Sequence, residues 1–146
     1  MSTISVTQQK RFHVFHITLW VAQVIVAGMF LMAGSLKTFT PIAELSLLMP
    51  LADDSPFLTR FIGIVEILGA VGLILPVALK ISPRLTVWAA YGLTFTMVLA
   101  TLFHAVRAEF LATPTTIVLG LLSAFIAWGR STKAPVKASR RIFDIG

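Results

Sequence analysis

Four long apolar stretches dominate the chain, and each one has about the length needed to cross the hydrocarbon core of a lipid bilayer. They cover about residues 16–39, 57–79, 84–106 and 113–130, and a spanning helix needs about 20 apolar residues. Within a bilayer the backbone must satisfy its own hydrogen bonds, so each stretch is restricted to a helix. The sequence therefore predicts an all-α protein, an antiparallel four-transmembrane-helix bundle.

The composition is that of a membrane protein with room for one domain. Of the 146 residues, 57% are hydrophobic and only 12% are charged, whereas a typical soluble domain has about 25% charged residues. We expect a single membrane domain over residues 1–146, ending in a basic cytoplasmic tail over residues 131–146. The chain has no cysteine, which excludes disulfides, thiolate metal sites and thiol nucleophiles.

Helix starts are marked by a hydroxyl residue followed by proline. The hydroxyl can cap the first helical turn, and proline at the first helical position loses no hydrogen bond. The pair precedes spans two, three and four, at Ser55-Pro56, Ser82-Pro83 and Thr113-Pro114. A fourth pair, Thr40-Pro41, opens the segment Pro41–Met49, which has one apolar face. This pattern predicts a short interfacial helix between spans one and two.

The basic residues predict how the chain is oriented. Nine of the twelve lysines and arginines fall on one predicted side of the membrane, namely Lys10, Arg11, Lys80, Arg84, Arg130, Lys133, Lys137, Arg140 and Arg141. The other three are Lys37, Arg60 and Arg107. Because basic residues collect on the cytoplasmic side, we expect a multi-pass protein of the inner or plasma membrane with both termini cytoplasmic. The net charge of +6 then reports topology, and no motif supports nucleic-acid binding.

Glu66 is the strongest signal for a functional site. It lies within the otherwise apolar run Phe61–Leu75, and a charged group at the centre of a membrane helix costs at least about 2.5–3.5 kcal/mol. The carboxyl group should therefore face the bundle interior and have a polar partner from another helix. Two interpretations are open: a proton-carrying or ligand-binding carboxyl group, and a structural pair with Lys37 or another polar group.

Each span carries one stripe of small and polar residues at helical spacing, the composition expected where membrane helices pack together. The stripes include Lys37 on the first span, Glu66 on the second, His104 on the third and Ser123 on the fourth. A rise of about 1.5 Å per residue puts Ser123 at the depth of Glu66, with Lys37 and His104 nearer the non-cytoplasmic end. We expect a polar pocket open to that side.

The candidates for ligand binding or proton relay are Glu66, Lys37, His104, Arg60 and Ser123. Lys37 either turns inward to Glu66 or extends to the lipid headgroups. His104 either relays protons or is an ordinary interfacial residue. Lipid phosphate is the expected partner of Arg60. The sequence predicts no metal site and no covalently bound cofactor, and it identifies no catalytic residue.

Several local motifs accompany these residues. They are Ala33-Gly34-Ser35-Leu36-Lys37, the run from Phe61 to Ala70 around Glu66, Gly72-Leu73-Ile74-Leu75-Pro76, Phe103-His104 and Ala127-Trp128-Gly129-Arg130. With these motifs the chain resembles the DoxX-like family of small four-span membrane proteins over about residues 17–130. Some relatives are subunits of quinone-linked oxidoreductases, including thiosulfate:quinone oxidoreductase. The resemblance implies that Lys37, Glu66 and His104 match positions where the family carries polar residues within the bundle.

Two functional expectations follow, and neither decides whether the chain is itself an enzyme. The first is a quinone-binding or redox-associated membrane subunit, in which quinone is a non-covalent ligand and a redox enzyme subunit is the partner. A quinone head group needs hydrogen-bond donors and a proton exchanger, which Lys37, Glu66 and His104 could supply. The second is a non-enzymatic carrier or a membrane-protein assembly factor. Either one is compatible with a homo-oligomer in the lipid bilayer.

Overall fold

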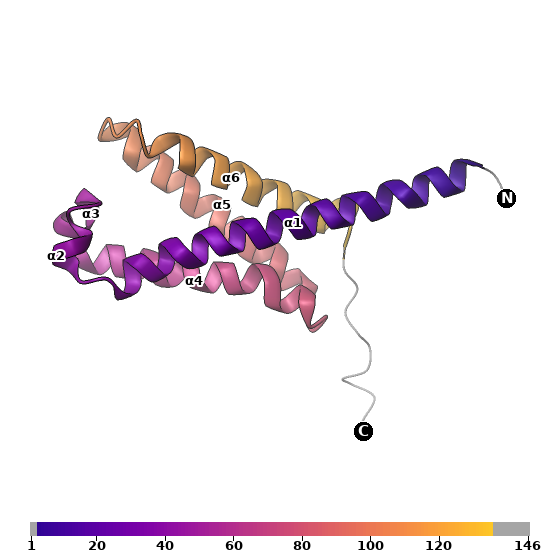
Figure 1. Cartoon of the computed structure of the whole chain (residues 1–146), viewed down its shortest axis with the longest axis horizontal. Coiled ribbons are helices and arrows are strands. Elements are labelled where there is room, and N and C mark those ends of the chain that lie inside the picture. Colours follow the sequence, from indigo (N-terminus) through magenta and orange to yellow (C-terminus); the bar gives the residue numbers. More distant parts are fainter. Residues whose placement is uncertain (1–2, 136–146) are drawn as a thin grey trace, which may run out of the picture.

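The computed structural model describes residues 3–135, which fold into helices joined by short connections (Figure 1). Four are long: α1 (Thr3–Phe39), α4 (Pro56–Ala78), α5 (Pro83–Val106) and α6 (Thr113–Trp128). Two short helices, α2 (Ile42–Leu45) and α3 (Pro50–Asp54), follow α1, and a π-helical turn, η1 (Gly129–Lys133), follows α6. The described residues contain no strand, so the predicted all-α class is confirmed. Most of the predicted tail, residues 136–146, lies outside the described residues.

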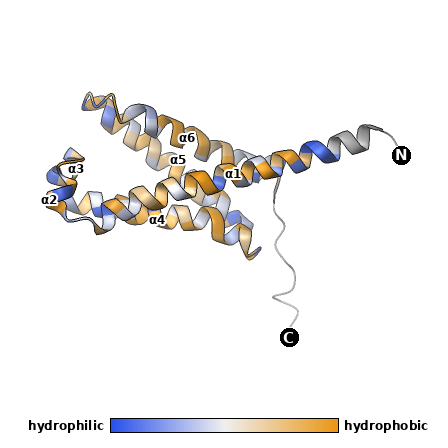
Figure 2. Cartoon of the chain, viewed as in Figure 1, coloured by the Kyte–Doolittle hydropathy of each residue, from blue (hydrophilic) through white to orange (hydrophobic). Residues whose placement is uncertain are grey.

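Three of the long helices have the length and apolar composition needed to cross a membrane, judged over the described part of the chain. They are α1 from Gln9 to Phe39, α4 and α5. Large apolar side chains remain exposed along these helices, as expected where lipid replaces water around a helix. Figure 2 shows hydrophobic residues along much of the long helices. Helix α6 has 16 residues, which is about 24 Å of helix against about 30 Å of hydrocarbon.

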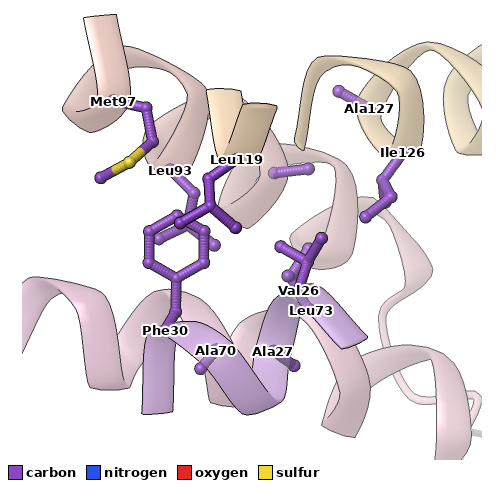
Figure 3. Packing of buried hydrophobic residues seen from close by; sticks show 11 residues of the cluster. Val26, Ala27, Phe30, Ala70, Leu73, Leu93, Met97, Leu119, Ile126 and Ala127 are labelled. Carbon is purple, nitrogen blue, oxygen red and sulfur yellow. The ribbon is translucent and has the colours of Figure 1, made fainter. Parts of the chain in front are cut away.

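The long helices pack in a closed ring: α1 contacts α4, α4 contacts α5, α5 contacts α6, and α6 returns to α1. The ring encloses one apolar cluster, in which the Phe30 ring of α1 lies among side chains of the other helices (Figure 3). The buried residues of the ring include Ala27, Phe30, Ala70, Ala90, Met97 and Ala127. Small residues at these positions let the helices approach one another closely.

The connection between α1 and α4 differs from the prediction. The helix predicted over Pro41–Met49 is confirmed only in part, because α2 covers Ile42–Leu45, a turn follows, and a second short helix, α3, begins after Met49. Pro50 explains why Met49 does not continue into α3 as one helix. A residue before proline is forced out of the helical region, and Met49 is extended, with φ −145° and ψ 119°. Helix α3 then begins at Pro50 itself, where a missing N–H costs nothing.

The predicted helix starts are confirmed at two positions, but the expected hydroxyl caps are not formed. Ser55 and Ser82 are the N-cap residues of α4 and α5, each followed by proline. Neither side chain makes a capping hydrogen bond. Helix α6 begins one residue earlier than expected, so that Ala112 is its N-cap and Thr113 its first residue. Proline lies in the first turn of α4, α5 and α6, where its missing N–H costs no hydrogen bond, so proline predicts these helix starts better than the hydroxyl residue does.

Candidate functional site

Glu66 lies in the middle of α4 and is paired with Lys37 from the last turn of α1. The ammonium group of Lys37 donates to both carboxylate oxygens, at 2.6 Å to Oε1 and 2.7 Å to Oε2. The Glu66 side chain is 2% exposed and the Lys37 side chain 20% exposed. The predicted pairing is confirmed, and the contact is direct. Of the two interpretations of Lys37, the inward one describes the structure.

Two glycines bring the helices close enough for this pair. A methyl group added at Gly34 of α1 would lie 2.7 Å from the carbonyl oxygen of Gly63 in α4. One added at Gly63 would lie 2.8 Å from Cβ of Lys37 and 2.9 Å from the carbonyl oxygen of Gly34. The two backbones therefore touch within a turn of the ion pair. This close contact fixes how far Lys37 must reach to meet Glu66.

Arg60 stabilises the end of α1 beside the pair. Its Nη1 donates to the carbonyl oxygen of Lys37 at 2.7 Å, and its Nη2 donates to that of Thr40 at 2.6 Å. The last carbonyls of a helix have no partner within the helix and carry the negative end of its dipole. The structure thus gives Arg60 backbone partners where lipid phosphate was expected. Arg60 positions Lys37 through its backbone and does not contact Glu66 by a hydrogen bond.

His104 belongs to a second polar cluster, which we call the connection clasp and define as Asp54, His104, Arg107 and Glu109. The Nδ1 of His104 lies 2.6 Å from Glu109 Oε2, and it carries the hydrogen because a carboxylate only accepts. Arg107 donates to Glu109 Oε1 at 2.9 Å and to Asp54 Oδ2 at 2.7 Å. The clasp therefore joins the end of α5 to the end of α3. No hydrogen bond among the described residues links it to Glu66.

The electrostatics of the clasp favour an ionised Glu109. Its hydrogen bond from His104 lowers the pKa of the Glu109 carboxyl group, and the hydrogen bond from Arg107 adds to this effect. The same contacts with Glu109 and Asp54 raise the pKa of Arg107. Sequence reasoning missed this cluster because Asp54, Arg107 and Glu109 look like ordinary loop charges. Its only local signal is three ionisable residues, His104, Arg107 and Glu109, within one turn and connection.

Ser123 lies in the core of α6 and is fully buried. Its hydroxyl oxygen has no hydrogen-bond partner among the described residues, so the structure does not join it to Glu66. Three of the hollows on the described part of the chain have volumes of about 280, 380 and 410 Å³. None of the three is lined by Lys37 or Glu66. The pocket around Glu66 therefore stays a prediction.

A third polar cluster lies at the other end of the bundle. Arg130 donates from Nε to Gln23 Oε1 at 2.6 Å, and Gln23 donates from Nε2 to the carbonyl oxygen of Leu73 at 2.6 Å. Arg130 Nη1 lies 3.1 Å from His16 Nδ1. The sequence assigns Arg130 to the basic residues that predict topology. Its place on the same stripe as Ser123 was the available sign that it faces inward.

Comparison with known proteins supports one assignment. A search of curated proteins and a search of solved structures found no match. The model of the DoxX-like family matches residues 21–126, more than two thirds of the chain. The match includes α4 and α5 entirely and the ion pair between Lys37 and Glu66. An integral membrane protein with several apolar helices is consistent with this match, and the chain belongs to the DoxX-like family.

Proposed function

We propose that this DoxX-like protein is a quinone-binding or redox-associated membrane subunit. The observation that carries the proposal is the Lys37–Glu66 pair, an ion pair between two apolar helices with one member still partly exposed. A buried ion pair returns about what its desolvation costs, so apolar packing at the same place would stabilise the bundle at least as well. Ionisable residues within membrane helices usually mark a functional site, so we infer a function for this pair.

The geometry of the pair suits a ligand that accepts a hydrogen bond and takes up a proton. An ammonium group has three N–H donors, and Lys37 directs two contacts to Glu66. In the proposal, the third N–H donates to a quinone carbonyl oxygen. The pair passes two protons to the quinone in turn, and each proton is replaced from water at the membrane surface, which the partly exposed Lys37 can reach. Reduction of a quinone takes two electrons and two protons. The electrons come from a partner redox subunit.

The topology is part of the same proposal. Helix α6 together with η1 covers residues 113–133, about the length of a spanning helix. The bundle then has four antiparallel spans with both termini in the cytoplasm, and α2 and α3 lie on the opposite side. Lys37, at the end of α1, would face the non-cytoplasmic half of the membrane. A quinone would approach the pair from there, through a pocket open to that side.

A quinone titration of the purified full chain tests the proposal. The wild type should bind a short-chain ubiquinone analogue, and Glu66→Gln should weaken binding by about tenfold or more, the loss expected for a charge-assisted contact. Glu44→Gln makes the same chemical change at an exposed carboxylate of α2 and should bind as the wild type does. Equal binding by all three proteins, or binding by none, would overturn the proposal.

The alternative is a non-enzymatic role as a carrier or an assembly factor. Two observations favour it: both carboxylate oxygens of Glu66 already accept from Lys37, and none of the three hollows reaches the pair. Purification of the protein from native membranes separates the two functions. A stable redox enzyme subunit that copurifies supports the first, and a varied set of membrane-protein clients supports the second.

A further inference from the structure

The buried guanidinium group of Arg130 lacks a full set of partners. Arg130 is 3% exposed and lies in η1, directly after α6. Its described contacts are with uncharged groups: the Gln23 amide oxygen, His16 Nδ1, and the Trp20 ring at 5.4 Å from the guanidinium carbon. Its Nη2 is buried and has no hydrogen-bond partner among the described residues. A buried polar group in this state costs free energy until a partner arrives.

The described part of the chain offers no anion to this arginine. Every ion pair in that part involves Lys37, His104 or Arg107. Of the six acidic residues, Glu66 is paired with Lys37, Glu109 and Asp54 belong to the connection clasp, and Glu44 and Asp53 lie in α2 and α3. The sixth, Asp144, is outside the described residues. The counter-charge of Arg130 must therefore come from a bound anion or from the tail.

A hollow of about 380 Å³ lies beside Arg130. Its lining includes Arg130, Arg84, Trp88, Tyr91, Ser131 and Val77. Two arginines and two hydroxyl groups supply donors, valine side chains supply an apolar wall, and no acidic side chain lines the hollow. Guanidinium groups match the oxygens of a phosphate geometrically and bind them in a bidentate manner. The chemistry of the lining is thus that of a site for an anion with an apolar part.

The position of the hollow favours a lipid as the source of that anion. It lies where α4 ends, α5 begins and α6 continues into η1. Trp88 and Tyr91 pack edge to face, 6.4 Å between ring centroids, and both are exposed on the outside of α5. Exposed tryptophan and tyrosine near a helix end are typical of the membrane–water interface. Basic pockets between helices at that level bind lipid head groups.

We propose that this hollow binds a phosphate group, supplied by the head group of an anionic membrane lipid. The exposed Arg84 donates to the phosphate oxygens. Arg130 donates to them after its side chain rotates to bring the buried Nη2 to the hollow, and the glycerol and first acyl carbons lie against the valine side of the hollow. The lipid then provides the negative charge that the buried Arg130 lacks. The proposal concerns the end of the bundle opposite the Lys37–Glu66 pair and does not depend on quinone binding.

Native mass spectrometry of the full chain in detergent, titrated with phosphatidylglycerol, tests this site. Arg84→Gln and Arg130→Gln should each lower the apparent affinity by about tenfold, as the loss of a charged bidentate contact implies. Arg130→Lys should fall between, because it keeps the charge and loses the planar fork. Arg11→Gln is the matched control, since Arg11 is an exposed cation of α1 outside the hollow, and it should bind as the wild type does.

Three results would overturn the proposal. An equal loss in Arg11→Gln and Arg84→Gln would mean that lipid is held by general charge. Displacement of phosphatidylglycerol by inorganic phosphate at low millimolar concentration would identify a soluble anion as the ligand. Absence of lipid binding in the wild type, with binding gained in the full-length Asp144→Asn variant, would show that the tail fills the hollow. Because Arg84 is exposed, its variant remains informative if Arg130→Gln does not fold.

Discussion

At the ion pair, one lysine satisfies both oxygens of one glutamate, so the two residues form a single electrostatic unit. Removing either partner leaves the other charge within the bundle without compensation. Breaking a buried pair in this way costs about 3–5 kcal/mol, whereas replacing both partners costs much less. The partial exposure of Lys37 reduces the cost on its side, because the ammonium group can turn to the membrane surface.

A double-mutant cycle on the free energy of unfolding checks this coupling. Glu66→Ala should destabilise the protein by about 3 kcal/mol, Lys37→Ala should also destabilise it, and the double variant should cost less than the sum by at least about 1 kcal/mol. Reversible unfolding in mixed micelles supplies the measurement. Additive effects of the two substitutions would contradict the coupling. They would mean that the Lys37 ammonium group lies at the lipid surface and is not paired with Glu66.

The connection clasp predicts a pH dependence that belongs to Glu109. The pKa of Glu109 is lower in the folded protein than its ordinary value of 4.5, so folding favours the ionised carboxyl group. Its contribution is complete above the ordinary pKa and disappears as the pH falls through the lowered pKa. Wild type should therefore melt at a higher temperature than Glu109→Gln at pH 7. The difference should begin to shrink as the pH falls below 4.5 and should vanish only below the lowered pKa of the folded protein.

The same melting series on Glu44→Gln serves as the control, because Glu44 is an exposed carboxylate outside the clasp. Its melting temperature should follow the wild type at both ends of the pH range. A difference between wild type and Glu109→Gln that persists below the lowered pKa would contradict the assignment. The lost side-chain packing of Glu109, rather than its charge, would then explain the effect.

At the residue scale, the sequence predicts the partners of a polar side chain where helical spacing shows that the side chain faces the bundle interior. It does not predict them where no such pattern exists. Lys37 and Glu66 lie on stripes of adjacent helices, and the helix rise makes their contact calculable. The partners of Arg60 depend on the place where α1 ends, which no pattern fixes to a residue. The partners of Arg130 depend on which helices are neighbours in the ring. From the sequence we expect a lipid partner for Arg60 and a topology role for Arg130, whereas in the structure both bond to protein groups.

At the scale of the helices, the contact between α1 and α4 is set by glycine at Gly34 and Gly63. Gly34→Ala should push the helices apart, because the added methyl group would meet the Gly63 carbonyl oxygen at 2.7 Å, an atom of the backbone that cannot turn away. Overpacking of this kind costs about 1–3 kcal/mol. The shift should also loosen the ion pair, since Lys37 lies one turn further along α1.

The matched control is Gly28→Ala on the same helix. A methyl group at Gly28 meets nothing within 4 Å, and alanine is favoured over glycine within a helix by up to about 1 kcal/mol. Gly28→Ala should therefore be neutral or stabilising in the same unfolding measurement. If Gly34→Ala also left the free energy of unfolding unchanged or raised it, this would contradict the close contact between α1 and α4 at Gly34.

The elements themselves were largely predictable from the sequence. Apolar length fixed the ends of α4, α5 and α6 to within two residues of the predicted spans. The second short helix, α3, is not predicted, because the apolar face that marks the first one ends at Met49. The start of α1 lies well before the predicted residue 16. The polar residues before residue 16 also form helix, but a hydropathy pattern detects only the apolar part of α1.

At the scale of the whole molecule, the question is how many times the chain crosses the membrane. Three helices meet the length and composition of a span, and α6 is shorter, with η1 extending it by five residues. The ring of contacts places α6 between α5 and α1, which favours a helix at the same depth as its neighbours. Our four-span proposal puts the α1–α4 connection outside and η1 inside.

Single cysteines at Ser46 and Ser131 distinguish the topologies. The native chain has no cysteine, so a membrane-impermeant maleimide applied to intact cells has no background to label. Four spans with cytoplasmic termini predict labelling at Ser46 from outside, and labelling at Ser131 only after the membrane is opened, because nine of twelve basic residues then lie inside. Labelling of both from outside would mean that α6 does not cross. The reverse pattern would mean an inverted bundle, in which the basic residues had been misread.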